Sequence, residues 1–316
     1  MSLLSKLSNA RQKIELKNHT TFRIGGPAKY FFVAQSQEDF IKAVRAAKEA
    51  ETPFYLLGGG SNMLVADEGF EGLVIKYNFS AQHEKKKSEE LELTVEAGTL
   101  FNKVILGAVK AGYSGIEWGF GIPGTIGGAV FGNAGRLGQD ISGAVKAVKV
   151  LDKNLNEQVL TQKECGFGYR ESGFLKAGAT ILEVTLRLAE KNREEIDKTF
   201  NEAREVILHG PKFPSAGCAF KNYKLNGEDD ELLKNHPELK ERVRGGKIGV
   251  GYLIDQAGMK GKKVGGAQVW EGHANYVINT GGATGQEVKT LMDNVVEAVG
   301  EKYGTLLEPE VRLLGF

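Results

Sequence analysis

The chain has 316 residues, of which 41% are hydrophobic and 26% charged, as in a folded globular protein of two or three domains. Lysine and arginine number 41 against 40 aspartate and glutamate, so no global charge favours nucleic acid or an anionic membrane as a partner. No apolar run is long enough for a signal peptide or a membrane span. We therefore expect a cytoplasmic monomer with no nucleic-acid and no membrane partner.

The first part of the chain predicts a small α/β unit. A short apolar strand at 30–34 is followed by a helical pattern that begins after a capping Ser36. A second buried strand at 54–57 ends in the glycine-rich sequence GGGSN, and a third strand covers 72–76.

The rest of the chain alternates between strands, helices and two strongly charged stretches. The charged residues 83–90 are expected at a solvated hairpin tip, and the charged residues 226–244 as a surface insertion, with a lid or an oligomer contact as the alternative. Strands are predicted at 91–98, 144–151, 179–188, 276–279 and 310–314, and helices at 100–110, 194–208 and 284–301.

Glycine is unusually frequent, with 42 residues, and it gathers in clusters. Residues 119–124 match GxGxxG, but a helix-like segment precedes them and Pro123 lies inside, which argues against a Rossmann nucleotide site. The GGGSN cluster lacks the Lys of a P-loop. Both clusters can offer backbone N–H groups to a pyrophosphate, and the alternative is that they are only tight turns.

The two cysteines, Cys165 and Cys218, form no CxxC pair, so a structural zinc site built on cysteine is not expected. His273 has no second histidine or cysteine at a metal-ligand spacing, and we expect no metal. Cys218 follows a glycine in the stretch PSAGCAFKN. From this pattern alone it is either a small buried side chain or a thiol that takes part in chemistry.

Eight motifs in order resemble the UDP-N-acetylenolpyruvoylglucosamine reductase family over nearly the whole chain. They are NHTTFRIGGP, LLGGGSNMLVADEGF, GIEWGFGIPGTIGGAVFGNAG, FGYRESGF, PSAGCAFKN, GYLIDQAGMKG, HANYVIN and LEPEVRLLG. The resemblance implies an α+β protein with a two-part FAD-binding fold of the vanillyl-alcohol-oxidase/MurB type. It divides the chain into 1–78, to which a strand at 305–316 can return, 79–208, and an α+β substrate domain at 209–304.

The family reduces UDP-N-acetylglucosamine enolpyruvate to UDP-N-acetylmuramate with NADPH and FAD, in peptidoglycan precursor synthesis. The resemblance implies an oxidoreductase of this kind; the alternatives are another FAD oxidoreductase of the same fold and a non-catalytic nucleotide-sugar binding protein. Only six residues separate Phe174 from the strand at 181, which resembles the type II form that lacks a tyrosine-bearing loop.

The resemblance also assigns roles to residues of this chain. FAD is expected at Gly58, Gly59, Gly60, Ser61, Asn62, Gly124, Thr125, Gly127 and Gly128. The catalytic residues are expected to be Arg170, Cys218 and Glu310, with Cys218 at the position where the family usually has a proton-donating serine. Substrate contacts are expected from Asn222, Asn275 and Lys260, with Lys212 and Lys262 as further phosphate or NADPH partners.

Overall fold

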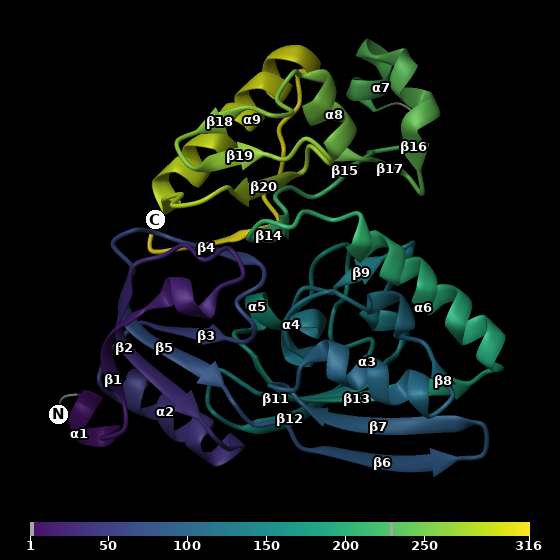
Figure 1. The fold of residues 1–316 in the computed structure, drawn as a ribbon. Helices are drawn as coiled ribbons and strands as arrows, with labels where there is room; N and C mark the ends of the chain where they lie inside the picture. The colour runs from purple at the N-terminus through teal and green to yellow at the C-terminus, as the bar shows by residue number, and fades with distance from the viewer. Residues whose placement is uncertain (1–2, 228–229) are drawn as a thin grey trace. The chain divides into compact units, whose positions relative to one another are not determined.

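The computed structural model describes residues 3–227 and 230–316, which group into two compact units (Figure 1). Unit 1 comprises the N-terminal residues to 13 together with 29–59 and 71–210, and unit 2 comprises 14–28, 60–70 and 211–316. Each unit is thus assembled from segments that are distant in sequence. The division into three domains stays a prediction.

The first sheet of unit 1 has the strand order β1-β2-β5-β3. Its strands are β1 (Arg11–Glu15), β2 (Pro27–Ala34), β5 (Phe70–Tyr77) and β3 (Phe54–Leu57). Helix α2 (Gln37–Glu49) begins as predicted after Ser36, whose hydroxyl accepts a hydrogen bond from the N–H of Asp39. The apolar face of α2 shares a core with the sheet and with the short helix α1 (Leu3–Lys6).

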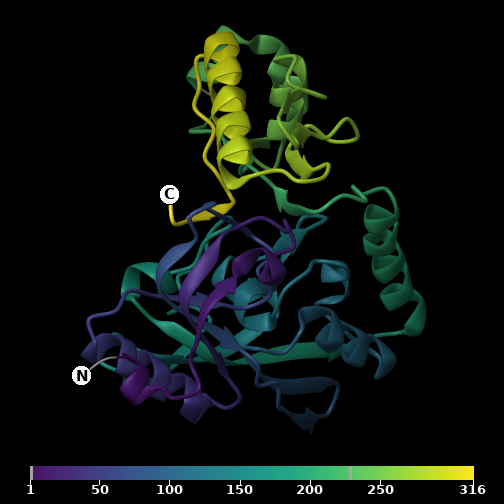
Figure 2. The same ribbon diagram turned by 60° about the vertical axis from the view of Figure 1, so that its left-hand side comes forward.

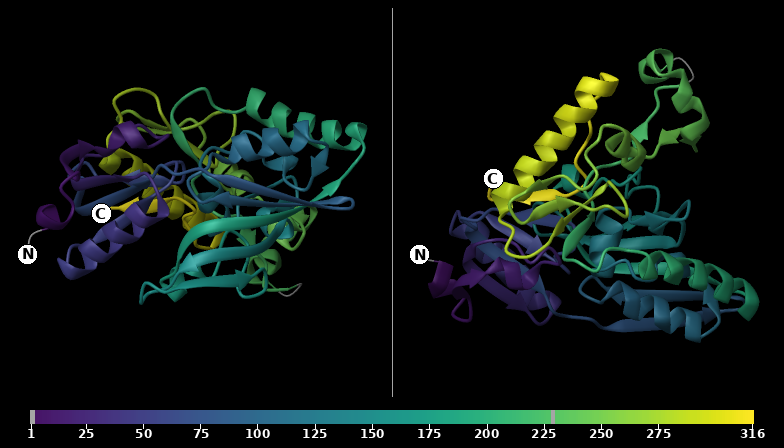
Figure 3. Two further views of the ribbon diagram at one scale, coloured as in Figure 1. Left: turned by 90° about the horizontal axis from the view of Figure 1, so that it is seen from below. Right: turned by 45° about the horizontal axis from the view of Figure 1, so that its top comes forward.

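The second sheet of unit 1 is antiparallel, with the order β12-β11-β13-β7-β6 (Figure 3 shows it from a second direction). Its strands are β12 (Glu157–Thr161), β11 (Val145–Leu151), β13 (Thr180–Glu190), β7 (Glu90–Glu96) and β6 (Gln82–Lys87), and β8 (Tyr113–Ser114) pairs with β13. Helices α3 (Phe101–Lys110) and α4 (Ile126–Phe131) share one apolar core with this sheet.

Short elements connect the sheet and helices of unit 1. They are η2 (Glu117–Gly119), β9 (Gly135–Arg136), β10 (Gln139–Asp140), η3 (Ile141–Gly143), α5 (Phe174–Ala177) and α6 (Arg193–Leu208). The segment that follows α4 and the segment that precedes α5 are of most interest, because both contribute to the candidate site.

The charged stretch at 83–90 is a strand for most of its length, which differs from the expected hairpin tip. Residues 82–87 form β6 and pair with β7 along their whole length, so only the two residues Ser88 and Glu89 form the turn. Every side chain of β6 is exposed. An edge strand that carries this much charge resists pairing with another chain, which explains the composition without a binding role.

Unit 2 is built on a sheet with the order β14-β20-β19-β18 (Figure 2). Its strands are β14 (Ser215–Cys218), β20 (Tyr276–Asn279), β19 (Ala267–Val269) and β18 (Lys263–Val264). Helix α9 (Gly285–Tyr303) begins with a capping box between Thr284 and Glu287, and it shares a core with helix α8 (Val250–Gln256) and the sheet.

The segment at 60–70 belongs to unit 2 because hydrogen bonds fix it there. Strand β4 (Met63–Val65) pairs in parallel with the last strand, β21 (Arg312–Leu314). The 3-10 helix η1 (Leu16–His19) lies in the 14–28 segment of the same unit. The carboxylate of Asp67 accepts hydrogen bonds from the N–H groups of Gly285 and Gln286, at 2.7 and 3.0 Å. This carboxylate satisfies the first turn of α9.

The described residues of the charged region at 226–244 are mostly exposed, as expected for a surface segment, but three of its leucines are buried in the core of unit 2. Its described elements and their neighbours are β15 (Tyr223–Lys224), α7 (Glu231–Asn235), η4 (Pro237–Arg242), β16 (Val243–Arg244) and β17 (Lys247–Ile248). Leu232, Leu233 and Leu239 are buried and belong to the same apolar cluster as α8 and α9. Leu232 and Leu233 lie in α7 and Leu239 in η4, and in the sequence all three stand among charged residues. Within the described ranges, no helix is both long and apolar enough to cross a bilayer.

Candidate active site

Two glycine-rich loops of unit 1 meet backbone to backbone. A Cβ atom added at Gly59 would lie 2.5 Å from the Cα atom of Gly124, and one added at Gly58 would lie 2.7 Å from the Oγ1 atom of Thr125. No side chain fits at either position, so the end of β3 and the loop before α4 approach more closely than other residues would allow. Such paired backbone suits a ligand rich in acceptor oxygens, such as a pyrophosphate.

Two of the glycines predicted to bind the cofactor, Gly127 and Gly128, have backbone N–H groups that are bonded within the protein. The N–H of Gly127 donates to the carbonyl of Ala97 at 3.0 Å, and the N–H of Gly128 donates to the Oγ1 atom of Thr125 at 3.2 Å. A Cβ atom at Gly127 would lie 2.7 Å from the Cβ of Ala97. These contacts hold the start of α4 against Ala97, which directly follows β7.

The end of the GGGSN sequence belongs to unit 2. Gly60 has a φ of +63°, and an added Cβ atom there would lie 2.0 Å from the carbonyl oxygen of His19, so only glycine fits. The side-chain amide of Asn62 donates to the carbonyl of Glu310 at 3.2 Å, and the carbonyl of Asn62 accepts from the N–H of Arg312. Within unit 2, Asn62 is thus joined to the segment that carries one of the predicted catalytic residues.

Arg170 lies at the tip of a tight turn in unit 1. Gly168 and Glu171 exchange two backbone hydrogen bonds across this turn, and Arg170 has a φ of +57°, in the left-handed region that non-glycine residues seldom adopt. The Nη2 atom of Arg170 donates to the carbonyl of Gly135 at 2.7 Å, and its guanidinium lies 5.5 Å from the ring centre of Tyr169. The cation is therefore held in one place on a strained turn.

Asn133 supports this turn, and sequence reasoning did not single it out. It is 2% exposed; its Nδ2 atom donates to the carbonyl of Gly168 at 2.8 Å and its Oδ1 atom accepts from the N–H of Ser142 at 3.2 Å. Its φ of +42° is one that asparagine tolerates better than most residues. The only sequence signal for Asn133 was its place in the family motif that ends in NAG, to which no role was assigned.

Cys218 ends β14 in unit 2, next to an irregularity in the sheet. Ser215 is paired with Ile278 and Cys218 with Tyr276, so β14 holds one residue more than β20 over this stretch. Gly217 takes up the extra length with a φ of +81°. This bulge explains the glycine before Cys218, whose side chain is half-buried.

Glu310 is brought to Cys218's strand by backbone pairing. The N–H of Glu310 donates to the carbonyl of Ala219 at 2.8 Å, and the N–H of Lys221 donates to the carbonyl of Glu308 at 2.9 Å. The side chains of Lys221 and Glu308 also form an ion pair. The thiol segment and the glutamate segment therefore run side by side within unit 2, as a shared site requires.

The residues expected to contact substrate occupy different environments. The Oδ1 atom of Asn222 accepts from the N–H of Val250 at 3.2 Å, at the start of α8. Asn275 is 3% exposed, and its carboxamide bonds the backbone of Phe220. Lys260 is exposed and paired with Asp255 at 2.9 Å, and the predicted phosphate partners Lys212 and Lys262 are exposed.

Cys165 is more deeply buried than Cys218. It is 1% exposed, and its Sγ atom lies 3.2 Å from the carbonyl of Thr161 as a donor. Burial, with a smaller contribution from the charge of Glu164, raises the pKa of the Cys165 thiol to about 11. It is therefore an unreactive core residue, as the sequence suggested.

We expect a thiol reagent to distinguish the two cysteines. At pH 8 only roughly one Cys165 thiol in a thousand is ionised, whereas Cys218 is accessible. Iodoacetamide should label one thiol per native chain, at Cys218, and the second only after denaturation. Peptide mass spectrometry of wild type and Cys218→Ser checks this. Labelling of native Cys165 at the faster rate would contradict it.

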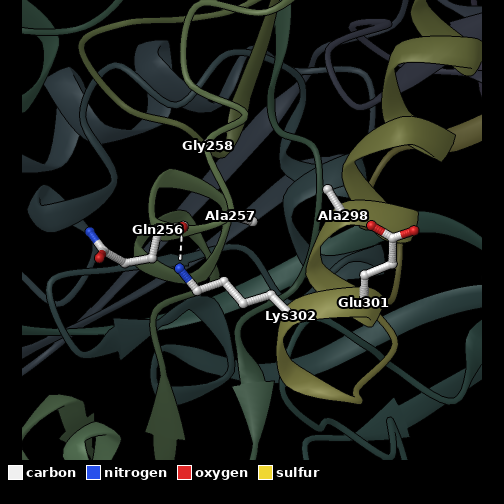
Figure 4. A pocket seen from close by; sticks show the side chains of 6 residues that line it. All are labelled: Gln256, Ala257, Gly258, Ala298, Glu301 and Lys302. Carbon is white, nitrogen blue, oxygen red and sulfur yellow. Dashed lines mark hydrogen bonds between the residues drawn. The ribbon is translucent and has the colours of Figure 1, made fainter.

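A shallow cavity of about 440 Å³ in unit 2 holds none of these residues. It is lined by Gln256, Ala257, Gly258, Ala298, Glu301 and Lys302 (Figure 4). Lys302 donates to the carbonyl of Gln256 and so caps the end of α8. Its lining carries no convergent set of catalytic groups, and we assign no ligand to it.

Among the described residues, no cluster of histidine, cysteine and carboxylate could hold a metal ion.

Comparison with known proteins accounts for both units. Residues 28–154 match the family model of an FAD binding domain, and residues 210–314 match that of the UDP-N-acetylenolpyruvoylglucosamine reductase C-terminal domain. The reductase of Chlamydia abortus is 35% identical over 309 residues, 98% of this chain and 95% of that protein. The reductase of Clostridium perfringens SM101 is 34% identical over 306 residues, 95% of this chain and 91% of that protein.

A solved structure is similar over almost the same extent. The crystal structure of the reductase MurB from Thermus caldophilus aligns with a TM-score of 0.75 and 33% identity, over 96% of this chain and 99% of that chain. The fold is therefore the predicted FAD-binding fold of an oxidoreductase, with mixed helix and sheet content. Within this class, the chain belongs to the UDP-N-acetylenolpyruvoylglucosamine reductase (MurB) family, whose members act in peptidoglycan synthesis.

The glycine loops fit the cofactor of this family. The closely packed backbone at 58–59 and 124–125 lies inside the matched FAD binding domain, and it excludes side chains where a pyrophosphate needs backbone N–H groups. Gly58, Gly59, Gly124 and Thr125 would hold this part of FAD. Gly127 and Gly128 follow at the start of α4, and their contact with FAD stays a prediction.

Proposed function

We propose that this enzyme reduces UDP-N-acetylglucosamine enolpyruvate to UDP-N-acetylmuramate with NADPH. The observation that carries the proposal is the pairing of the Cys218 and Glu310 segments in unit 2, in a chain of this family. The reaction adds two electrons and two protons across a carbon–carbon double bond. NADPH supplies a hydride equivalent to the terminal carbon, and the neighbouring carbon takes a proton from the protein. Bound FAD supplies the two-electron carrier between NADPH and the double bond.

Arg170 is proposed to stabilise the charge that develops on the substrate carboxylate. As hydride adds to the terminal carbon, negative charge spreads from the neighbouring carbon onto the carboxylate as an enolate. A guanidinium can donate two parallel hydrogen bonds to a carboxylate, and it stays charged at any working pH. The carbonyl of Gly135 accepts one N–H of Arg170, which holds the guanidinium in one orientation.

Cys218 is proposed to deliver the proton that completes the reduction. A thiol has an ordinary pKa of about 8.5, so it is mostly protonated at neutral pH and gives up its proton far more readily than an aliphatic hydroxyl. Cys218 is half-buried at the end of β14. Solvent then returns the proton to the thiolate after each turnover.

Glu310 is proposed to contact the substrate carboxylate. A carboxyl group that faces a second carboxylate is favoured in its protonated form, because like charges repel, and it can then donate a hydrogen bond to the enolate. Asn222, at the start of α8, and Lys260 are proposed to contact the substrate, and Lys212 and Lys262 its phosphates or those of NADPH.

The proposal predicts a substrate-dependent consumption of NADPH. The purified yellow protein should oxidise NADPH rapidly only when UDP-N-acetylglucosamine enolpyruvate is present, with UDP-N-acetylmuramate as the product by mass spectrometry. Equal NADPH oxidation with oxygen alone would indicate an oxidase of the same fold. Tight binding of the nucleotide sugar without NADPH consumption would indicate a binding protein. Either result would overturn the proposal.

A further inference from the structure

Asn275 makes an unusual set of contacts to the residues that follow Cys218. Its own carbonyl accepts the N–H of Ala219 at 2.7 Å. Its side chain bonds the next residue twice, because Oδ1 accepts the N–H of Phe220 at 3.0 Å and Nδ2 donates to the carbonyl of Phe220 at 2.8 Å. One residue thus satisfies three backbone groups of two consecutive residues.

These contacts replace a strand neighbour at the point where the sheet is irregular. The bulge in β14 interrupts its pairing with β20 just before Cys218. Beyond it, the carboxamide of Asn275 presents one donor and one acceptor to Phe220, the same pair of groups that an antiparallel partner residue exchanges. Asparagine has the right length for this, whereas aspartate lacks the donor and leucine lacks both groups.

The opposite side of the same short segment holds Glu310. The carbonyl of Ala219 accepts the N–H of Glu310 at 2.8 Å, and Phe220 forms a bridge with Pro309. Residues 219–220 therefore lie between Asn275 on one side and the glutamate segment on the other. Any shift of this segment moves the Cys218 sulfur relative to the Glu310 carboxyl.

Asn275 is 3% exposed, and both polar atoms of its carboxamide are used within the protein. We infer that Asn275 is a positioning residue, which fixes the separation of the Cys218 thiol and the Glu310 carboxyl, and that it does not bind the substrate. This inference rests on the proposed function of those two groups. It replaces the substrate contact that the sequence suggested for Asn275.

The chain offers a matched control at the other end of β20, the strand that Asn275 directly precedes. Asn279 is 7% exposed and also bonds only backbone: Nδ2 donates to the carbonyl of Phe22 at 3.2 Å, and Oδ1 accepts from the N–H groups of Gly281 and Ala283. None of these partners belongs to the Cys218 or Glu310 segments. Replacing Asn279 therefore removes a comparable buried network without disturbing the proposed proton donor.

The test compares Asn275→Leu with Asn279→Leu in the FAD-loaded enzyme. Each protein is reduced photochemically and mixed with UDP-N-acetylglucosamine enolpyruvate in a stopped-flow instrument, and the return of flavin absorbance is followed. Asn275→Leu should slow this step by roughly 10 to 100-fold, the effect of a displacement of about 1 Å, with its KM for the substrate changed less than about threefold. Asn279→Leu should melt at a similarly reduced temperature and react at close to the wild-type rate.

A second variant keeps the inference testable if Asn275→Leu fails to fold. Asn275→Asp retains the acceptor for Phe220 and regains a donor only when its carboxyl is protonated, which burial favours. Its rate relative to wild type should therefore rise as the pH falls from about 8 to about 6.

Three results would overturn the inference. The first is a raised KM for the substrate with an unchanged rate of flavin reoxidation in Asn275→Leu. The second is an equal slowing of flavin reoxidation in Asn279→Leu. The third is a rate of Asn275→Asp, relative to wild type, that does not change with pH. A Cys218→Ala variant is measured beside them. If it reacts at the wild-type rate, the proposed function of Cys218 is wrong; if it is slow, only the inference about Asn275 is wrong.

Discussion

Cys218→Ala should accept electrons from NADPH as fast as the wild-type enzyme and pass them to the substrate roughly 10²–10⁴-fold more slowly. The expected loss is that of a general acid removed from a proton transfer. Reduction by NADPH requires no proton from this thiol, so it is spared. Stopped-flow absorbance of the flavin resolves the two stages in one experiment.

Two variants control this result. Cys218→Ser restores a protonated group at the position where the family usually has serine, and should recover most of the second stage. Cys165→Ala removes a thiol of equal size from the core, where it is 1% exposed, and should lower the melting temperature but leave both stages within about twofold. Wild-type turnover in Cys218→Ala would show that the thiol is a bystander.

Gly59→Ala should yield a protein that retains little or no FAD. The new Cβ atom would lie 2.5 Å from the Cα of Gly124, a backbone atom that cannot rotate away, so the two loops must separate. Overpacking of this kind costs about 1–3 kcal/mol, which weakens FAD binding by about 5- to 150-fold if the strain falls on the bound state. The ratio of flavin to protein absorbance, and an FAD titration of the apoprotein, measure the effect.

Gly107→Ala is the matched control for this substitution. Gly107 lies in α3, and an added Cβ atom would meet no heavy atom within 4 Å. This variant should bind FAD normally and be slightly more stable, because alanine favours helix more than glycine does. Full flavin content with wild-type affinity in Gly59→Ala would contradict the assignment of the two loops as the pyrophosphate site.

Local patterns predicted much of the fold. The capping serine before α2, the buried strand that ends at Leu57 and the alternation along β7 all appear as the sequence indicated, because each depends on neighbours along the chain. The charged stretch at 82–87 became a strand because its partner β7 follows directly, and pairing overrode a composition typical of loops.

Sequence patterns did not predict the residues that support the site. The buried side chain of Asn133 bonds the backbone of Gly168, which is 35 residues away in the sequence. The buried side chain of Asn275 bonds the backbone of Phe220, which is 55 residues away. No periodicity marks such partners. Arg170, Cys218 and Glu310 were found only through the order of family motifs, since a lone arginine, cysteine or glutamate carries no signal of its own. Their joint action stays a proposal.

The most direct measurement is a two-stage trace of flavin colour with a single enzyme sample. Addition of NADPH without oxygen should bleach the yellow enzyme, and subsequent addition of UDP-N-acetylglucosamine enolpyruvate should restore the colour within one turnover, with one UDP-N-acetylmuramate formed per flavin. Enzyme that bleaches but stays colourless when this substrate is added would contradict the central claim that the chain is an enolpyruvyl reductase.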